Sequence, residues 1–251
     1  MNVDFMPVAI AIFVALVSTY TDIRWRIIPN RATYPATAFG IIFHLFLGIY
    51  SSNLLLCLRG FIGFGIAFLI GYLLWITGGW AGGDVKLFSA FGALLPSFSP
   101  PFAPAPYSSE YPLFALTVLF NTALVAIPVI LAYALLSYAK GEGAFYKRCK
   151  ITDLKEGMIP AEWIVERNGK LFRKSAILSF SGPSGNTYTN PNRASGLTRA
   201  QIIRLKRLVS EKRIENEIRV KRVVPFGPFL AAGLLVSVCY GDMYWGILAM
   251  L

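Results

Sequence analysis

The sequence predicts an all-α polytopic membrane protein with about six transmembrane helices and a small α+β cytoplasmic domain. Of its 251 residues 55% are apolar and only 15% are charged, and the mean hydropathy is +0.57. This composition is typical of chains that cross a bilayer several times. The net charge of +11 lies entirely between residues 140 and 224, so the rest of the chain is neutral. A basic excess confined in this way favours a membrane protein, and we expect no nucleic-acid partner.

Six apolar segments carry the predicted crossings. The fourth is short, and segments of this length also form re-entrant structures. The third contains glycines at 60, 63, 65 and 71, which predict close packing between helices. The only histidine, His44, lies in the second segment, where we interpret it as a packed residue. The predicted spans are residues 5–20, 32–50, 57–77, 85–97, 113–138 and 225–240.

The chain divides into a membrane domain at 1–139, a polar basic domain at 140–224 and a final span within 225–251. In the polar domain, Asn168-Gly169 predicts the turn of a β-hairpin. Thr198-x-x-Gln201 is a capping box that opens an amphipathic helix, whose basic side chains face either lipid headgroups or water. Loops are predicted at two Pro- or Gly-rich stretches, 96–112 and 181–192.

The basic residues also predict the orientation. The segments 21–32, 78–86 and 140–224 share one side of a six-span protein, and they hold 3, 1 and 19 of the 24 Lys and Arg residues. By the positive-inside rule that side is the cytoplasm. Residues 1–20 lack a basic start and a small-residue cleavage site, so we interpret them as a retained first span. The chain is therefore expected to be a multi-pass protein of the cell membrane.

The cysteines and the single histidine indicate neither a metal site nor a disulfide framework. The three cysteines are far apart, and no pair has the C-x-x-C spacing. We therefore expect no metal and no cofactor.

Asp22 and Asp84 are the candidate catalytic residues, because each is predicted at the cytoplasmic end of an apolar run. Ionisable groups at membrane depth are costly and usually functional. Two facing carboxyl groups can share one proton, so that one acts as a general base and the other as a general acid. The residues alone leave another interpretation open, in which Asp22 pairs with Arg24 or Arg26 and Asp84 pairs with Lys86.

Three sequence motifs resemble those of the prepilin peptidase family, which includes the archaeal preflagellin peptidases. The first joins Asp22 to Pro29-Asn30, and the second is Gly82-Gly83-Asp84-x-Lys86-Leu87. The third, Pro225-Phe226-Gly227-Pro228, is similar to the motif in the family's final span. Ala81 stands where the family's signature has a glycine.

The resemblance implies a membrane-embedded aspartic endopeptidase that uses Asp22 and Asp84. Its implied substrates are the signal peptides of pilin or archaellin precursors, which carry a short basic leader before an apolar helix. Membrane lipids are the other expected partners. The cysteine-rich insert linked to N-methylation in bacterial members has no counterpart, so peptidase activity alone is expected. The residues implied in substrate binding or support are Gly82, Gly83, Lys86, Pro29, Asn30, Pro225 and Pro228.

Three alternatives remain at this point. A presenilin-like intramembrane protease also uses a Gly-x-Gly-Asp acid, but the Ile28-Pro29-Asn30 segment fits it poorly. A small transporter would use paired acids on a permeation path, and we expect such a protein to show internal repeats. A non-enzymatic scaffold for pilus assembly would leave both acids dispensable.

Overall fold

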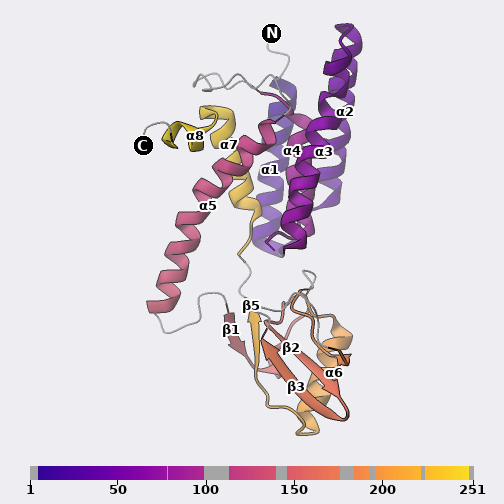
Figure 1. Ribbon diagram of the computed structural model, residues 1–251, viewed down its shortest axis with the longest axis vertical. Helices are drawn as coiled ribbons and strands as arrows, with labels where there is room; N and C mark the ends of the chain where they lie inside the picture. Colours follow the sequence, from indigo (N-terminus) through magenta and orange to yellow (C-terminus); the bar gives the residue numbers. More distant parts are fainter. Residues whose placement is uncertain are drawn as a thin grey trace. The chain divides into compact units, whose positions relative to one another are not determined.

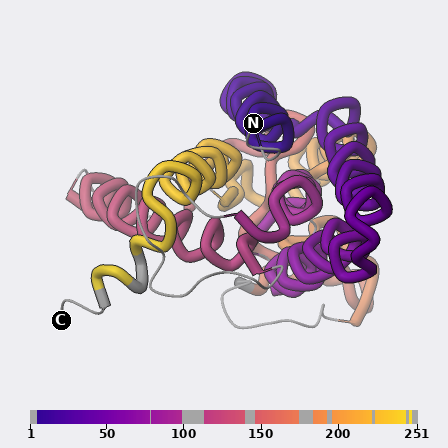
Figure 2. The backbone as a smooth tube through the Cα atoms, turned by 90° about the horizontal axis from the view of Figure 1, so that it is seen from above, coloured from indigo at the N-terminus to yellow at the C-terminus, as the bar shows by residue number. Residues whose placement is uncertain are grey.

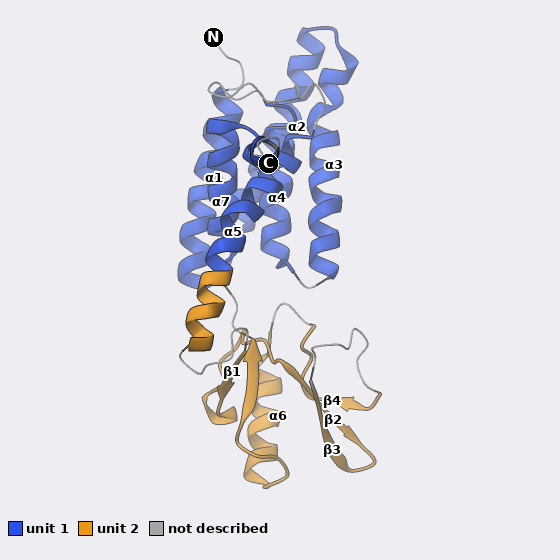
Figure 3. Cartoon of the chain, turned by 60° about the vertical axis from the view of Figure 1, so that its left-hand side comes forward, with its two compact units in different colours: residues 1–130, 225–251 blue, residues 131–224 orange. Residues whose placement is uncertain are grey.

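The computed structural model describes residues 5–77, 79–98, 113–139, 146–175, 184–192, 196–221 and 224–248 (Figure 1). Gly78, most of the predicted loop at 96–112 and residues 181–183 of the second loop lie outside the described residues. The chain forms two compact units (Figure 3). Unit 1 comprises residues 1–130 and 225–251, and unit 2 comprises residues 131–224.

Unit 1 is helical, and among the described residues four helices, the last of which continues into unit 2, are long and apolar enough to cross a membrane. These are α1, α2, α3 and α5. The prediction of about six crossings is not confirmed, because among the described residues only four helices reach spanning length, while α4 has 13 residues and α7 has 14. The helices are α1 (Phe5–Trp25), α2 (Asn30–Tyr50), α3 (Leu54–Ile76), α4 (Gly82–Leu94), α5 (Phe114–Ala139), α7 (Gly227–Tyr240) and α8 (Met243–Leu248).

Helix α1 is longer than the sequence predicts. We expected the first span to end at residue 20, but the helix continues to Trp25, so Asp22 lies inside its last two turns. The charged residues near its end do not interrupt the helix. Arg24 lies close enough to the end for its long side chain to place the charge at the membrane interface. The helix stops where Arg26 takes a left-handed conformation with φ of 57°. Pro29 then precedes α2 with extended backbone.

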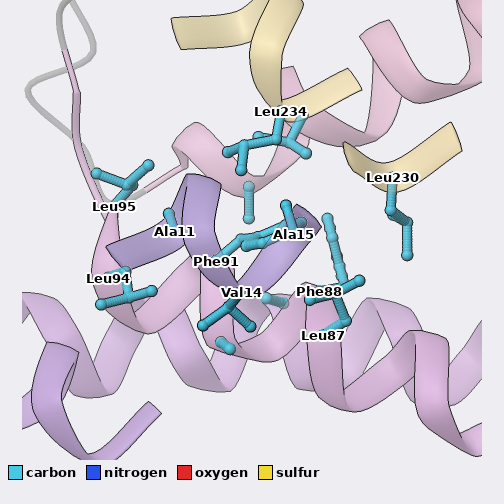
Figure 4. Packing of buried hydrophobic residues seen from close by; sticks show 14 of the residues in the cluster. Ala11, Val14, Ala15, Leu87, Phe88, Phe91, Leu94, Leu95, Leu230 and Leu234 are labelled. Atoms are coloured by element: carbon cyan, nitrogen blue, oxygen red, sulfur yellow. The ribbon is translucent and has the colours of Figure 1, made fainter. Parts of the chain in front are cut away.

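Helix α4 is the central element of unit 1. Ten of its 13 residues are buried, and it packs against α1, α2, α3 and α7. Seen from above, the longer helices surround it (Figure 2). Its Leu87, Phe88 and Phe91 contribute to the main apolar cluster together with residues of α1 and α7 (Figure 4). Since the neighbours screen α4 from the surroundings, its length is set by packing inside the bundle.

Glycines bring α3 and α4 into close contact, which confirms the packing predicted for the third span. A Cβ atom on Gly63 would collide with the carbonyl oxygen of Gly92 and lie 2.8 Å from Cβ of Pro96. A Cβ atom on Gly92 would in turn collide with the backbone of Gly63. Gly65, by contrast, has no atom within 4 Å of such a Cβ. His44 is buried as predicted, and its Nε2 lies 3.1 Å from the carbonyl oxygen of Leu94.

Polar side chains join α5 to α7 inside unit 1. The fully buried Asn121 donates from Nδ2 to Ser237 Oγ at 2.9 Å and to the carbonyl oxygen of Gly241 at 2.7 Å. The Thr117 hydroxyl donates to Asp242 Oδ2 at 3.2 Å. Hydrogen bonds between helices of an apolar bundle fix their relative depth and rotation. The end of α7 is thereby held by α5.

Unit 2 contains two small antiparallel sheets and one amphipathic helix. The strand order is β1-β5 in one sheet and β3-β2-β4 in the other. The predicted hairpin is confirmed, because Arg167 pairs with Lys170 and both turn residues, Asn168 and Gly169, have positive φ. The elements are β1 (Tyr146–Cys149), η1 (Ile151–Asp153), β2 (Glu162–Arg167), β3 (Lys170–Ser175), β4 (Asn186–Thr187), α6 (Arg199–Ser210) and β5 (Ile218–Lys221).

The capping box of α6 is also confirmed. The Gln201 N–H donates to Thr198 Oγ1 at 3.3 Å, and the Thr198 N–H donates to Gln201 Oε1 at 3.0 Å. Ile202, Leu205 and Leu208 lie on the buried face of α6. The apolar cluster of unit 2 includes residues of α6, η1, β2 and β5, so this unit has a core of its own.

A hydrogen-bonded cluster on the surface of unit 2 is centred on Glu166. The Tyr188 hydroxyl donates to Glu166 Oε2 at 2.7 Å, and Arg213 Nη2 donates to Glu166 Oε1 and to the carbonyl oxygen of Gly169. The hydrogen bonds from Tyr188 and then Arg213 lower the pKa of the Glu166 carboxyl below its ordinary value. The cluster therefore links β2 to two later segments.

Gly63→Ala is expected to lower the stability of unit 1 by about 1–3 kcal/mol, because the added methyl group meets the backbone of α4. Gly65→Ala is the matched control and is expected to change stability by less than about 0.5 kcal/mol. Thermal unfolding of both variants in the same detergent measures the difference. Equal effects at the two positions would contradict the close α3–α4 contact.

Glu166→Gln is expected to weaken the β2–β3 hairpin at neutral pH. Because the folded-state pKa of Glu166 is lowered, its contribution is present above the ordinary pKa of a glutamate and is lost as the pH falls through the lowered value. Hydrogen exchange of the β2 and β3 amides, corrected for intrinsic rates, should therefore be pH-dependent in wild type and less so in the variant. Glu211→Gln, which removes an exposed pair with Arg207, is the control and should have little effect.

Candidate active site

Two buried aspartates lie on neighbouring helices of unit 1. Asp22 is 8% exposed and belongs to α1, while Asp84 is 5% exposed and is the third residue of α4. The buried residues of α1 include Ala11, Ala15, Ser18 and Asp22, spaced by three or four residues. This spacing places Asp22 on the helix face that packs inside the bundle. Helices α1 and α4 are in contact, so the two aspartates belong to adjoining helices.

Asp22 is held by the first residue of α7. The Gly227 N–H donates to Asp22 Oδ2 at 2.9 Å, although the two residues are 205 positions apart. The first N–H groups of a helix have no partner within the helix and carry partial positive charge, so they stabilise a carboxylate. A side chain at Gly227 would crowd the carboxyl group, because its Cβ would lie 3.0 Å from Asp22 Oδ2 and 3.3 Å from Asp22 Cβ.

Asp84 is held by the backbone just before α4. The Ala81 N–H donates to Asp84 Oδ2 at 2.9 Å. Ala81 has φ of −86° and ψ of 159°, a conformation open to any residue, so the alanine at this position is compatible with the local geometry. Gly83 allows a close approach between the start of α4 and Ile28. Its Cβ would lie 3.0 Å from Cβ of Ile28, so it permits close approach to the α1–α2 connection rather than to the acid.

Lys86 and Asn30 are brought together at the starts of α4 and α2. Lys86 Nζ donates to Asn30 Oδ1 at 2.9 Å and lies 5.5 Å from the centre of the Tyr34 ring. Pro29 is the residue before α2. Within the described residues neither Asp22 nor Asp84 forms an ion pair, which argues against the interpretation that they are paired with neighbouring basic residues.

The prolines of the third motif flank the residue that contacts Asp22. Pro228 lies in the first turn of α7, where the lack of an N–H costs no helical hydrogen bond. Phe226 contacts Trp80 with ring centroids 5.4 Å apart, which joins the start of α7 to the segment before Asp84. Gly82 makes no close approach, since no atom lies within 4 Å of a Cβ built there.

Gly227 is the site residue that sequence reasoning missed. It was quoted within the third motif, but only Pro225 and Pro228 were singled out. The sequence feature that indicates Gly227 is its position directly before Pro228 at the start of a helix. A glycine at such a position can allow another group to approach the backbone closely. In the described ranges no group of three or more His, Cys, Asp or Glu residues could hold a metal ion.

Buried paired carboxyl groups on adjacent apolar helices define a candidate aspartic-protease site. A family model for the type IV leader peptidase family matches residues 9–135. The chain belongs to this family. The matched residues include both aspartates, whereas the Gly227 motif lies outside the match.

Three curated proteins are similar to parts of the chain. Prepilin peptidase EppA of Methanothermobacter thermautotrophicus is 35% identical over 139 residues, which are 53% of this chain and 36% of that protein. The preflagellin peptidase of Methanococcus voltae is 31% identical over 51% of this chain and 58% of its own length. That of Methanocaldococcus jannaschii is 28% identical over 51% and 56%. The similarity thus spans between a third and three fifths of these relatives.

We expect Asp22 to protect the Gly227 amide from hydrogen exchange, and Asp84 to protect the Ala81 amide. Asp22→Ala should speed exchange of the Gly227 amide about 10–100-fold, because a hydrogen bond to a charged group contributes about 1.5–3 kcal/mol. The Ala81 amide should change little in that variant. Asp84→Ala is the reciprocal control and should speed exchange of Ala81 but not of Gly227. Acceleration of both amides in both variants would indicate general loosening of the bundle instead.

Proposed function

We propose that this protein is a membrane-embedded aspartic endopeptidase that removes the short basic leader from type IV prepilin-like or archaellin precursors. The observation that carries the proposal is the pair of buried carboxyl groups, Asp22 and Asp84, each anchored by a backbone N–H from a separate segment. Membership of the type IV leader peptidase family supports it. The relatives named prepilin peptidase and preflagellin peptidase support the substrate class.

The proposed chemistry needs only the two carboxyl groups and one water. Facing carboxyl groups in an apolar setting share a proton. The ionised member takes a proton from the water as its oxygen adds to the scissile carbonyl carbon, and the protonated member donates to the carbonyl oxygen. When the tetrahedral intermediate collapses, the C–N bond breaks and the leaving nitrogen receives a proton. The leader then ends in a carboxylate and the mature chain begins with an amine.

The anchoring hydrogen bonds prepare this step. Asp22 and Asp84 each use Oδ2 to accept from a backbone N–H, which fixes the rotation of each carboxyl plane. The Oδ1 atoms are the ones we assign to proton exchange with water and substrate. Groups fixed in advance lose little freedom on reaching the transition state. Backbone donors suit this role, because they cannot be charged and do not compete for the shared proton.

The remaining motif residues have supporting roles in this proposal. The Lys86–Asn30 hydrogen bond holds the start of α4 next to the start of α2, and Pro29 sets the direction in which α2 begins. Gly83 allows α4 to start close to Ile28, whereas Gly82 has open space around it and is given no contact role. Pro225 and Pro228 keep the first turn of α7 at Asp22.

We further propose six crossings, with α4 and α7 as short spans. A helix normally needs about 20 apolar residues to cross a bilayer. The shorter α4 can serve because neighbouring helices cover it, and a segment buried in protein need not match the bilayer thickness. In a six-span arrangement nearly all Lys and Arg residues lie on the same side as Asp22 and Asp84, and the positive-inside rule makes that side the cytoplasm. Residues 140–224 then form the cytoplasmic domain between the fifth and sixth spans.

Asp22→Asn and Asp84→Asn are each expected to reduce leader removal by at least about 100-fold, because either change removes one proton-transfer group. The measurement is cleavage of a prepilin or prearchaellin by membranes that carry equal amounts of each variant. Asp242→Asn is the matched control, since Asp242 is also a buried acid of unit 1 but is bonded to Thr117 on α5. It should retain most of the activity.

Near wild-type cleavage by either Asp22→Asn or Asp84→Asn would reject the two-carboxylate mechanism. A wild-type protein that cleaves neither precursor would reject the proposed substrate class. A scaffold role would then account better for the chain.

A further inference from the structure

The Ser18 hydroxyl is buried next to the candidate active site and has no hydrogen-bond partner. Ser18 is 0% exposed, and its Oγ is among the buried polar atoms without a partner in the described structure. It precedes Asp22 by four residues on α1, so the two side chains lie on one face about 6 Å apart along the helix axis. Thr19 Oγ1, three residues before Asp22, is also buried and unpartnered.

Other buried hydroxyls in the same bundle behave differently. Ser89 on α4 donates to the carbonyl oxygen of Val85 at 2.7 Å, and Ser237 on α7 donates to that of Gly233 at 2.7 Å. Thr122 on α5 does the same with Val118 at 2.6 Å. A bond to the preceding turn is the usual way for a helical hydroxyl in an apolar setting to be satisfied. Ser18 forgoes it.

An unsatisfied buried hydroxyl is costly, so its presence calls for a compensating role. Leaving such a group without a partner is much less favourable than replacing it by an apolar one. Helix α7 packs along α1 and starts at Asp22, and Figure 3 shows the two helices side by side. One turn into α7 lie Leu230 and Ala231, both buried. Ser18 therefore lies on the buried face of α1, four residues before the acid that the start of α7 contacts.

We propose that Ser18, assisted by Thr19, binds the backbone of the precursor chain next to the scissile bond. The proposal rests on the function proposed above. An extended peptide segment that reaches Asp22 presents carbonyl oxygens at the spacing of successive residues, about 3.3 Å. The Ser18 hydroxyl would donate to the carbonyl one or two residues along the apolar side of the cut. Because Ser18 is enclosed here, the precursor reaches it by displacing side chains that cover α1.

The test compares Ser18→Ala with Ser89→Ala in the full-length protein. The substrate is a synthetic peptide with a basic leader followed by the apolar segment, and kcat, KM and the thermal unfolding temperature are measured in the same detergent. For Ser18→Ala we expect KM to rise about fivefold to tenfold with kcat within about twofold of wild type, because a bond equally present in bound substrate and transition state acts on KM. Its unfolding temperature should be equal to or above that of wild type.

Ser89→Ala is matched in residue type, burial and setting, but it removes a satisfied hydrogen bond. We expect an unchanged KM and a lower unfolding temperature. An unchanged KM in Ser18→Ala would overturn the inference while leaving the proposed function intact. A rise in KM accompanied by a fall in unfolding temperature like that of Ser89→Ala would also overturn it, because the effect would then be structural. Absence of wild-type turnover would instead reject the proposed function.

Discussion

The hydrogen bond from the Gly227 amide to Asp22 is the interaction on which the geometry of the candidate site depends. It joins α1 to α7 across 205 positions of the chain. An ionised carboxyl group inside an apolar bundle is unfavourable unless donors replace the lost water. The first amide of α7 supplies such a donor, and the absence of a side chain at Gly227 lets it come within reach. Asp84 meets the same requirement through the Ala81 amide, so both acids are held by backbone groups.

This arrangement requires the helices to keep their depth and rotation. At its start, α7 is fixed by Asp22, and at its end Asn121 of α5 bonds to Ser237 and Gly241. Helix α4 is fixed by packing, since the glycines at 63 and 92 let α3 and α4 approach backbone to backbone. Polar bonds and small residues are the two general means by which helices associate in an apolar medium. Helix α4, which carries Asp84, and helix α7, which anchors Asp22, therefore each have a further constraint.

Polar groups inside unit 1 fall into two kinds, and the distinction separates structure from candidate function. The Ser89 and Thr122 hydroxyls donate to backbone carbonyls of their own helices, and Asn121 Nδ2 donates from α5 to Ser237 and Gly241; such hydrogen bonds stabilise the bundle. Ser18 lies four residues before Asp22 on α1, and its buried hydroxyl has no hydrogen-bond partner within the described residues. Proteins tolerate such unfavourable local features mainly where a substrate later completes them. Unit 2 contains its own apolar core and a surface cluster around Glu166.

Local features of the molecule could be predicted from the sequence by itself. The four long apolar runs, the Asn168-Gly169 turn and the capping box at Thr198 depend on residues a few positions apart, and each is present in the structure. The family was also recognisable, because its motifs are short stretches of sequence. Whether six helices cross the membrane was not determined in this way, since α4 and α7 are shorter than a normal span.

The tertiary structure decided what these residues contact. It placed Asp22 inside α1 rather than after it, and it assigned the amide of Gly227 to that acid. It also showed that Gly83 lies close to Ile28, and that the hydroxyl of Ser18 is left without a partner while that of Ser89 is not. None of these facts follows from spacing along the chain. A hydrogen-bond partner or a close contact between distant segments depends on how the helices pack, and packing is a property of the whole bundle.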